Sequence, residues 1–162
     1  MSNQEKIEES KIPYNRNTAN FEEQFLTEKN IDNFELSDIP GYKVGTSGAS
    51  FIFSGIVRSD RSEKGIVSAI IYECYKDMAE KEIEKIRSET LKKFAVNMIY
   101  IKHRIGRVYV GESSLIVAVL SAHRKEGIKA VDYIIDEIKK KVPIWKKEIF
   151  EDGTHRWVKG NV

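Results

Sequence analysis

The 162-residue sequence contains one cysteine, three prolines and no long apolar run. Cys74 has no partner for a disulfide within the chain, and no group of cysteines and histidines has zinc-ligand spacing, so we expect neither a metal nor a cofactor. No apolar run approaches the ~18 residues that a membrane-spanning helix needs. The N-terminal residues 1–11 also lack the apolar core of a signal peptide. These absences predict a soluble, cytoplasmic protein that does not bind a membrane.

Charge of one sign is scarce as well. The 27 Lys and Arg residues nearly balance the 25 Asp and Glu residues, which leaves a net charge of +2. Such a balance gives no support for nucleic-acid binding, and no DNA- or RNA-binding motif is present. The sequence also lacks a phosphate-binding loop, a serine nucleophile elbow and the helical signature of zinc proteases. Those enzyme classes are therefore excluded.

Residues 1–40 are polar, and we expect a flexible leader there, with a short helix near residues 21–26. We expect the folded domain over residues 41–159. Apolar alternation predicts strands, and spacings of three and four predict two helices, the first beginning at a capping box, Asp77–Glu80. The predicted strands cover residues 49–58, 66–75, 97–102, 107–110 and 114–121, and the second helix covers 124–141. A hairpin around Asp152-Gly153 follows. This order predicts an α+β fold with a mixed or antiparallel sheet, two main helices and a C-terminal hairpin.

Three apolar patterns identify the expected core. The run Leu115–Leu120 is continuous, which predicts a strand buried on both faces. The first helix has a stripe at Ala79, Ile83, Ile86, Thr90 and Phe94. The second has a stripe at Ile128, Val131, Ile135, Ile138 and Val142, and Pro143 ends it.

The densest positive charge lies at the end of the second helix, where five lysines occur within residues 138–147. Lysines at a helix C-terminus commonly stay in water and complement the helix dipole. The apolar interruption Val142-Pro-Ile-Trp145, however, should anchor the segment to the core. Lys139 and Lys146 would then be held on either side of a fixed bend.

Other candidate residues stand at the ends of predicted strands. His123-Arg124 lies where a buried strand gives way to a helix, a position that favours an anion, although His123 could simply cap the helix. Arg58 also ends a strand. With two lysines, these groups would suit a phosphorylated substrate. In Lys102–Arg107, Gly106 predicts a turn, so we assign His103 and Arg104 structural or interface roles. Cys74 has no adjacent base and is interpreted as structural.

Several segments together resemble the large-subunit family of molybdopterin synthase, in order and in spacing, over about residues 45–158. They are Phe51-Ile-Phe-Ser-Gly-Ile-Val-Arg58, Tyr72-Glu-Cys-Tyr75, Met78-Ala-Glu80, His103-Arg-Ile-Gly106, Ser121-Ala-His-Arg124 and Lys139-Lys-Lys-Val-Pro-Ile-Trp-Lys-Lys-Glu148.

The resemblance implies an α/β-hammerhead fold and a homodimer. Each protomer would bind a small ubiquitin-like sulfur-carrier subunit, which makes a heterotetramer. The carrier's C-terminal Gly-Gly thiocarboxylate would donate sulfur to cyclic pyranopterin monophosphate, and two transfers would make the molybdopterin dithiolene. Sulfur arrives on the partner, so no cysteine nucleophile is needed.

By motif position, the resemblance makes Lys139 and Lys146 catalytic, with substrate-binding roles for Arg58, His123, Arg124, Phe53 and Ile135. We hypothesise that Lys139 acts at the reacting centre and that Lys146 positions the thiocarboxylate. Crowding of the two lysines should lower a lysine pKa toward the working range. Ser59-Asp60 departs from the family pattern, and Asp60 would either weaken anion binding or pair with Arg61. The alternative function is a non-catalytic scaffold or regulator that binds the carrier.

Overall fold

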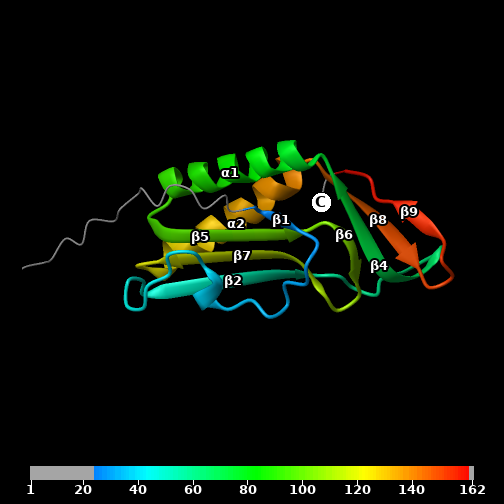
Figure 1. Ribbon diagram of the computed structural model, residues 1–162, viewed down its shortest axis with the longest axis horizontal. Helices are drawn as coiled ribbons and strands as arrows, with labels where there is room; N and C mark the ends of the chain where they lie inside the picture. Colours follow the sequence, from blue (N-terminus) through cyan, green and yellow to red (C-terminus); the bar gives the residue numbers. More distant parts are fainter. Residues whose placement is uncertain (1–23, 161–162) are drawn as a thin grey trace, which may run out of the picture.

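The first of two β-sheets contains four strands in the order β1-β5-β7-β2 in the computed structural model, which describes residues 24–160 (Figure 1). β5 and β7 are antiparallel, as are β7 and β2, whereas β1 runs parallel to β5. The sheet is therefore mixed, as expected. Its strands are β1 (Leu26–Thr27), β2 (Ala49–Ile56), β5 (Val96–Arg104) and β7 (Ser113–Ser121).

The second sheet is built around β4 (Gly65–Cys74), which pairs with β8 (Ile144–Phe150). β8 and β9 (His155–Trp157) form the predicted C-terminal hairpin. β3 (Arg61–Ser62) and β6 (Gly106–Tyr109) also pair with β4. β5 passes directly into β6 at Gly106, whose φ of 77° favours glycine, so the chain turns there from one sheet to the other.

Two helices, α1 (Lys76–Lys93) and α2 (Arg124–Lys141), cover the same face of the first sheet (Figure 1). These elements confirm the predicted α+β class. On α1 the first four positions of the predicted stripe are buried, and Phe94 packs against the core. No helix within residues 24–160 is long and apolar enough to cross a membrane.

The predicted capping box of α1 is wrong. Tyr75 is the N-cap residue and its side chain makes no capping hydrogen bond. The Glu80 carboxylate instead accepts hydrogen bonds from the backbone N–H groups of Phe25 and Leu26, at 2.8 and 2.9 Å. Glu80 thus binds residues 54 and 55 positions earlier in the chain and not the N-terminus of its own helix. Local sequence patterns cannot reveal such a long-range contact.

The buried face of α2 agrees with its predicted stripe except at Ile128. Ile138 and Val142 are buried, and Val131 and Ile135 pack against the core. Ile128 is 53% exposed, and the fully buried positions are Gly127, Ala130, Ile134 and Ile138. Gly127 allows the close approach, because a Cβ there would stand 2.5 Å from the ring of Phe51. The prediction weighted large apolar side chains, whereas small residues bring this helix onto the sheet.

β7 is buried at every position, as its apolar run predicted. Leu115, Val117 and Val119 belong to the core cluster that includes the buried residues of both helices. Ala118 and Leu120 belong to a second cluster with Ile39, against which further side chains pack: Phe34, Leu36, Tyr42, Met98 and Tyr100. The second face of β7 is therefore covered by the chain before β2, including the 3₁₀ turn Leu36–Asp38.

Residues 24–40, which we expected in a flexible leader, contact the domain. Phe25 and Leu26 are only 4% and 3% exposed, and β1 replaces the helix expected near residues 21–26. The rest of the predicted leader, residues 1–23, lies outside the described residues. The folded domain thus begins before residue 41, because the apolar side chains of Phe25 and Leu26 are buried in the core although their sequence neighbours are polar.

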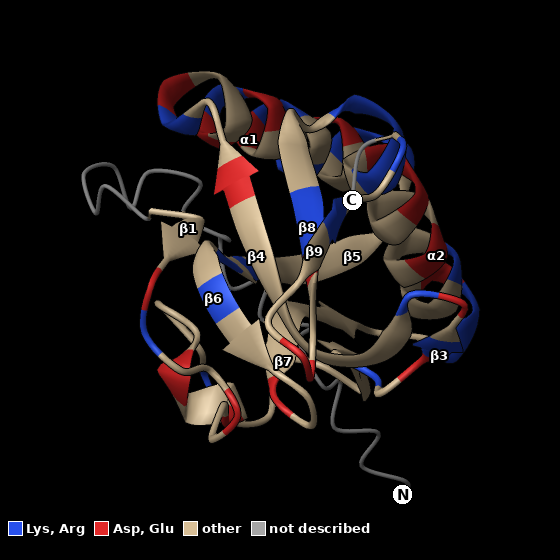
Figure 2. Ribbon diagram, turned by 90° about the vertical axis from the view of Figure 1, so that its right-hand side faces the viewer, with Lys and Arg blue, Asp and Glu red and all other residues tan. Residues whose placement is uncertain are grey.

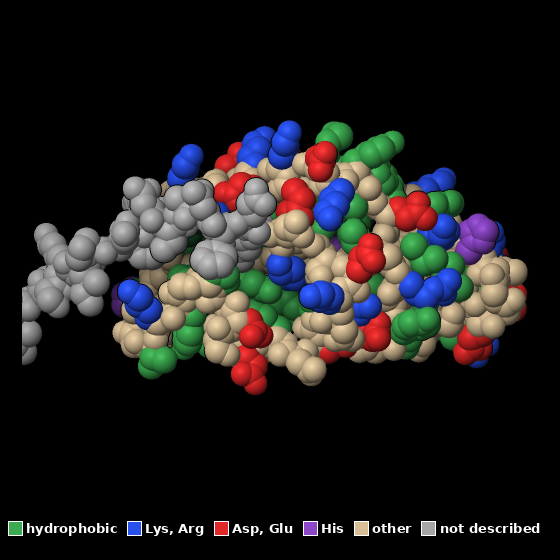
Figure 3. Space-filling model, viewed as in Figure 1, with side chains coloured by type: hydrophobic (Ala, Val, Ile, Leu, Met, Phe, Trp, Pro, Cys, Tyr) green, Lys and Arg blue, Asp and Glu red, His purple; other side chains and the backbone are tan. Residues whose placement is uncertain are grey.

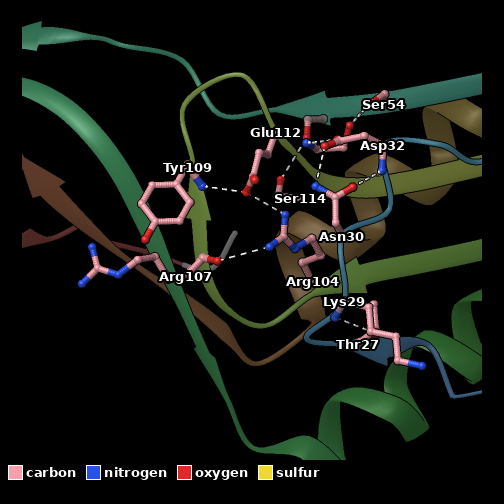
Figure 4. A network of polar contacts seen from close by, with 12 residues as sticks. Thr27, Lys29, Asn30, Asp32, Ser54, Arg104, Arg107, Tyr109, Glu112 and Ser114 are labelled. Atoms are coloured by element: carbon pink, nitrogen blue, oxygen red, sulfur yellow. Dashed lines mark hydrogen bonds and ion pairs between the residues drawn. The ribbon is translucent and has the colours of Figure 1, made fainter.

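A polar network ties this N-terminal segment to the start of β7 (Figure 4). The Asp32 carboxylate accepts the backbone N–H of Ser113 at 2.7 Å, and this bond lowers the pKa of Asp32. Arg104 and Glu112 form an ion pair at 2.8 Å. Glu112 also accepts the backbone N–H of Tyr109, which lowers its pKa. Arg104 therefore has the structural role expected from the sequence.

Surface charge is mixed in sign. On the face seen in Figure 3, Lys and Arg side chains lie among Asp and Glu side chains. Several ion pairs lie within one helix, such as Arg87 with Glu84 and Lys129 with Glu126. Such exposed pairs contribute little stability individually.

We predict that Glu80→Ala lowers the free energy of unfolding by about 1–3 kcal/mol, because two buried backbone N–H groups lose their acceptor. Urea unfolding would measure it. The matched control is Glu82→Ala on the same helix, whose carboxylate lies 4.0 Å from Lys85. Equal losses in the two variants would contradict a specific anchor at Glu80.

Candidate active site

A cavity of about 330 Å³ opens where the two sheets meet. Strands of both sheets and the last turn of α2 line it. Figure 2 shows a basic segment in the middle of β8, beside β4. The charged residues of the lining are Arg58, Asp60, Lys139, Lys146 and Glu148. Three cations against two carboxylates make the cavity a candidate site for an anion.

The bend after α2 brings the two predicted lysines together. Lys139 lies in the last turn of the helix, and Lys146 lies on β8. Between them Val142 and Ile144 are fully buried, so the expected anchoring of the segment is confirmed. The other lysines of the cluster form ion pairs elsewhere: Lys140 with Asp136, Lys141 with Glu137, and Lys147 with Glu73. Of the five lysines, Lys139 and Lys146 line the cavity.

Lys146 is the electrostatically unusual member of the pair. Burial lowers its pKa, and the neighbouring positive charge of Lys139 lowers it further. Glu148 opposes this effect, but its carboxylate is also bound by Arg156, with Nε at 3.0 Å. The expectation that a lysine pKa would be lowered is met at Lys146. A half-buried ammonium with a lowered pKa is suited to giving up a proton.

Arg58 and Phe53 also line the cavity, as the sequence predicted. Arg58 is exposed and pairs with Asp60 at 3.0 Å. Asp60, which departs from the family pattern, therefore pairs with the cavity residue Arg58 and not with Arg61. An incoming anion has to compete with Asp60 for the guanidinium.

The structure does not bring the remaining predicted residues into this cavity. His123 is the N-cap of α2 and Arg124 its first residue, both exposed. A helix of 18 residues is about 27 Å long, so they lie at the end opposite to Lys139. Ile135 packs against the main core, one turn before Lys139. Within one chain, the single anion pocket that we expected is thus divided between two places.

His103 and Tyr72 line the cavity, although neither was a predicted site residue. His103 is 1% exposed, and its Nδ1 lies 2.7 Å from the carbonyl oxygen of Arg104. Burial lowers the pKa of His103 from 6.5 to about 4, and the Lys146 charge adds to this effect. Burial raises the pKa of Tyr72, whose ring meets that of His103 edge-on at 5.2 Å.

A sequence signal for His103 existed. It continues the alternation of Ile99 and Ile101, both buried on β5, so the pattern places His103 on the core-facing side. Our structural interpretation of Cys74 fits its half-buried position outside the cavity lining, where burial raises the thiol pKa. Among residues 24–160, no group of His, Cys, Asp and Glu side chains has the arrangement of a metal site.

The fold and site define an α+β protein with a lysine-containing cavity that is a candidate site for an anion. The family model described as MoaE protein matches residues 26–141, which is more than half of the chain. The chain therefore belongs to the MoaE protein family.

Individual relatives agree with this assignment. The molybdopterin synthase catalytic subunit of Pyrococcus abyssi is 41% identical over 116 residues, which is 72% of this chain and 77% of that protein. The crystal structure of molybdopterin synthase from Staphylococcus aureus is similar with a TM-score of 0.74 and 33% identity, over 84% of this chain and 97% of that one. A Helicobacter pylori complex of subunits 1 and 2 of molybdopterin-converting factor shares the fold, at TM-score 0.60 and 23% identity, over 70% and 73%.

We predict that His103 makes the protein sensitive to acid. Between pH 6.5 and 4 the unfolded chain protonates this histidine while the folded chain does not. Stability present above pH 6.5 is therefore lost as the pH falls toward 4, by about 3 kcal/mol at most. His103→Gln removes this titration. Chemical denaturation should therefore show that the unfolding free energy of the wild type falls more than that of the variant as the pH goes from 6.5 to 4. His155→Gln removes an exposed histidine as a control, and equal pH dependence in both variants would refute the assignment.

Proposed function

We propose that this protein is the catalytic subunit of molybdopterin synthase, a sulfurtransferase of molybdenum-cofactor synthesis. It moves sulfur from the C-terminal thiocarboxylate of a small ubiquitin-like carrier to cyclic pyranopterin monophosphate. The observation that carries this is the meeting of Lys139 and Lys146 in one cavity, in a chain of the MoaE family. A cytoplasmic location stays a prediction.

The cavity suits both parts of this substrate. Arg58 and the two lysines supply positive charge for the phosphate. Phe53 and Tyr72 supply flat apolar surface for the ring system. Charge and apolar surface within one cavity favour a phosphorylated heterocycle over a simple inorganic anion.

The two lysines have different tasks. The Lys139 ammonium stabilises negative charge that develops at the reacting carbon. Lys146, whose pKa is lowered by burial and by Lys139, transfers a proton and positions the thiocarboxylate. Each sulfur transfer forms a carbon–sulfur bond on the pterin and breaks a carbon–oxygen bond at the same carbon, which releases water. Water then cleaves the acyl–sulfur bond, so the carrier leaves with a carboxylate in place of its thiocarboxylate.

The assembly that we propose is a homodimer with one carrier on each protomer. His123 and Arg124 keep their proposed role in substrate binding, and so does Ile135. Because His123 and Arg124 are exposed at the far end of α2, they can serve the cavity only of a second copy. The H. pylori complex, in which a chain with this fold is joined to a second subunit, supports a small-subunit partner.

We predict that Lys139→Ala lowers molybdopterin formation at least about 100-fold, because the charge at the reacting centre loses its counter-ion. The wild type, thiocarboxylated carrier and cyclic pyranopterin monophosphate would be combined, and the product assayed. Lys140→Ala is the control, since Lys140 pairs with Asp136 and lies outside the cavity lining. Near-normal turnover of Lys139→Ala would reject its role. Carrier binding by a wild type that forms no product would favour the scaffold alternative.

A second prediction concerns the competition of Asp60 with the substrate. Asp60→Asn frees Arg58 for the phosphate, so the dissociation constant of the pterin monophosphate should fall about two- to fivefold at low salt. Titration calorimetry would measure it, with Glu63→Gln in the same loop as control. The gain should shrink at high salt, where exposed charges are screened. Unchanged or weaker binding by Asp60→Asn would show that the carboxylate does not compete.

A further inference from the structure

His103 presents one unused polar atom to the cavity. Its Nδ1 faces the carbonyl oxygen of Arg104, and a carbonyl can only accept, so Nδ1 carries the ring proton. The other nitrogen, Nε2, then holds a lone pair. Within residues 24–160 Nε2 has no hydrogen-bond partner, although the ring is 1% exposed and lines the cavity. Among residues 24–160, Arg104 Nε is the one fully buried side-chain nitrogen or oxygen without a partner, so Nε2 of His103 keeps some accessible surface. Because His103 lines the cavity, a ligand in the cavity can reach this atom.

The two carboxylates of the cavity lining are already engaged. Asp60 is bound by Arg58, and Glu148 is bound by Arg156. The lysines and the arginine are donors only. The tyrosine hydroxyl of Tyr72 interacts with Ser114. The imidazole Nε2 is thus a neutral acceptor that has no hydrogen-bond partner among residues 24–160 and lies in a cavity lined by cations.

We propose that Nε2 of His103 accepts a hydrogen bond from a ring N–H of the bound pterin, which makes His103 a specificity-determining residue of the substrate pocket. This rests on the proposed function and deepens it. The edge-on contact with Tyr72 and the bond to Arg104 fix the plane of the imidazole, so the acceptor points in one direction. The cations hold the phosphate, and His103 selects a heterocycle that carries a donor.

The low pKa of His103 supports this role. Burial and the Lys146 charge keep the ring neutral at neutral pH, so Nε2 remains an acceptor there. A protonated ring would instead add a fourth cation and could not accept an N–H. The further charged residues of the cavity lining are Arg58, Asp60, Lys139 and Glu148. The Arg104 guanidinium pairs with Glu112 and lies outside the lining.

The first test observes the wild-type protein, and a variant serves only to assign its signals. The chain has three histidines, so ¹⁵N-histidine NMR of the full-length protein can follow His103 once His103→Gln has assigned its signals. Adding cyclic pyranopterin monophosphate without carrier should move the Nε2 resonance upfield, as expected when a bare imidazole nitrogen accepts a hydrogen bond. Inorganic phosphate, which reaches the cations alone, should leave it in place.

The second test compares two variants by titration calorimetry. His103→Leu should weaken pterin binding about tenfold, the value of one hydrogen bond to a buried acceptor. His103→Gln, whose amide oxygen can replace Nε2, should stay within about threefold. Carrier binding should be equal in all three proteins.

The outcomes separate this inference from the proposed function. A wild type that binds pterin and makes molybdopterin, with an unmoved Nε2 resonance, would overturn the role of His103 alone. Loss of carrier binding instead of pterin binding in His103→Leu would also overturn it, because the donor would then lie on the carrier's tail. A wild type that binds no pterin would overturn both. Should His103→Leu fail to fold, the wild-type resonance still decides.

Discussion

The structure depends on burying β7 on both faces. A strand with the run Leu115–Leu120 cannot leave either face in water, so the fold has to supply two covers. Both helices provide the first, and the chain before β2, around Ile39, provides the second. This requirement draws residues that look like a polar leader into the domain. It also sets the position of α2, which begins three residues after β7 ends.

The cavity follows from the way the chain leaves α2. Pro143 ends the helix, and the buried side chains of Val142 and Ile144 on either side hold the turn against the core. β8 then runs beside β4, with Lys146 opposite Tyr72. Two lysines seven residues apart thereby face one space, and their mutual repulsion, added to burial, lowers the pKa of Lys146. Rigid packing thus produces the electrostatic property that the chemistry needs.

The polar side chains of the cavity lining fall into two groups, those that are already paired and those that are not. Each carboxylate of the lining is engaged by an arginine, Asp60 by Arg58 and Glu148 by Arg156. Neither lysine of the lining lies within ion-pair distance of these carboxylates, and the His103 Nε2 has no hydrogen-bond partner among residues 24–160. A ligand that binds without displacing an ion pair therefore meets ammonium donors and the neutral acceptor of His103. That combination suits a molecule that carries both negative charge and an N–H group better than either feature alone.

The sequence by itself determined the α+β class, most element bounds, the doubly buried strand, the anchored lysine bend and the family. These features depend on local periodicity, on proline and on short motifs, all of which involve residues that are close together in the sequence. Tertiary structure alone decided that Glu80 binds Phe25 and Leu26 and that Gly127 brings α2 onto the sheet. It also placed His103 and Lys146 in the lining of one cavity. It also decided that His123 lies far from Lys139 in one chain. Those facts join residues distant in sequence, and only the packing of one element against another sets such distances.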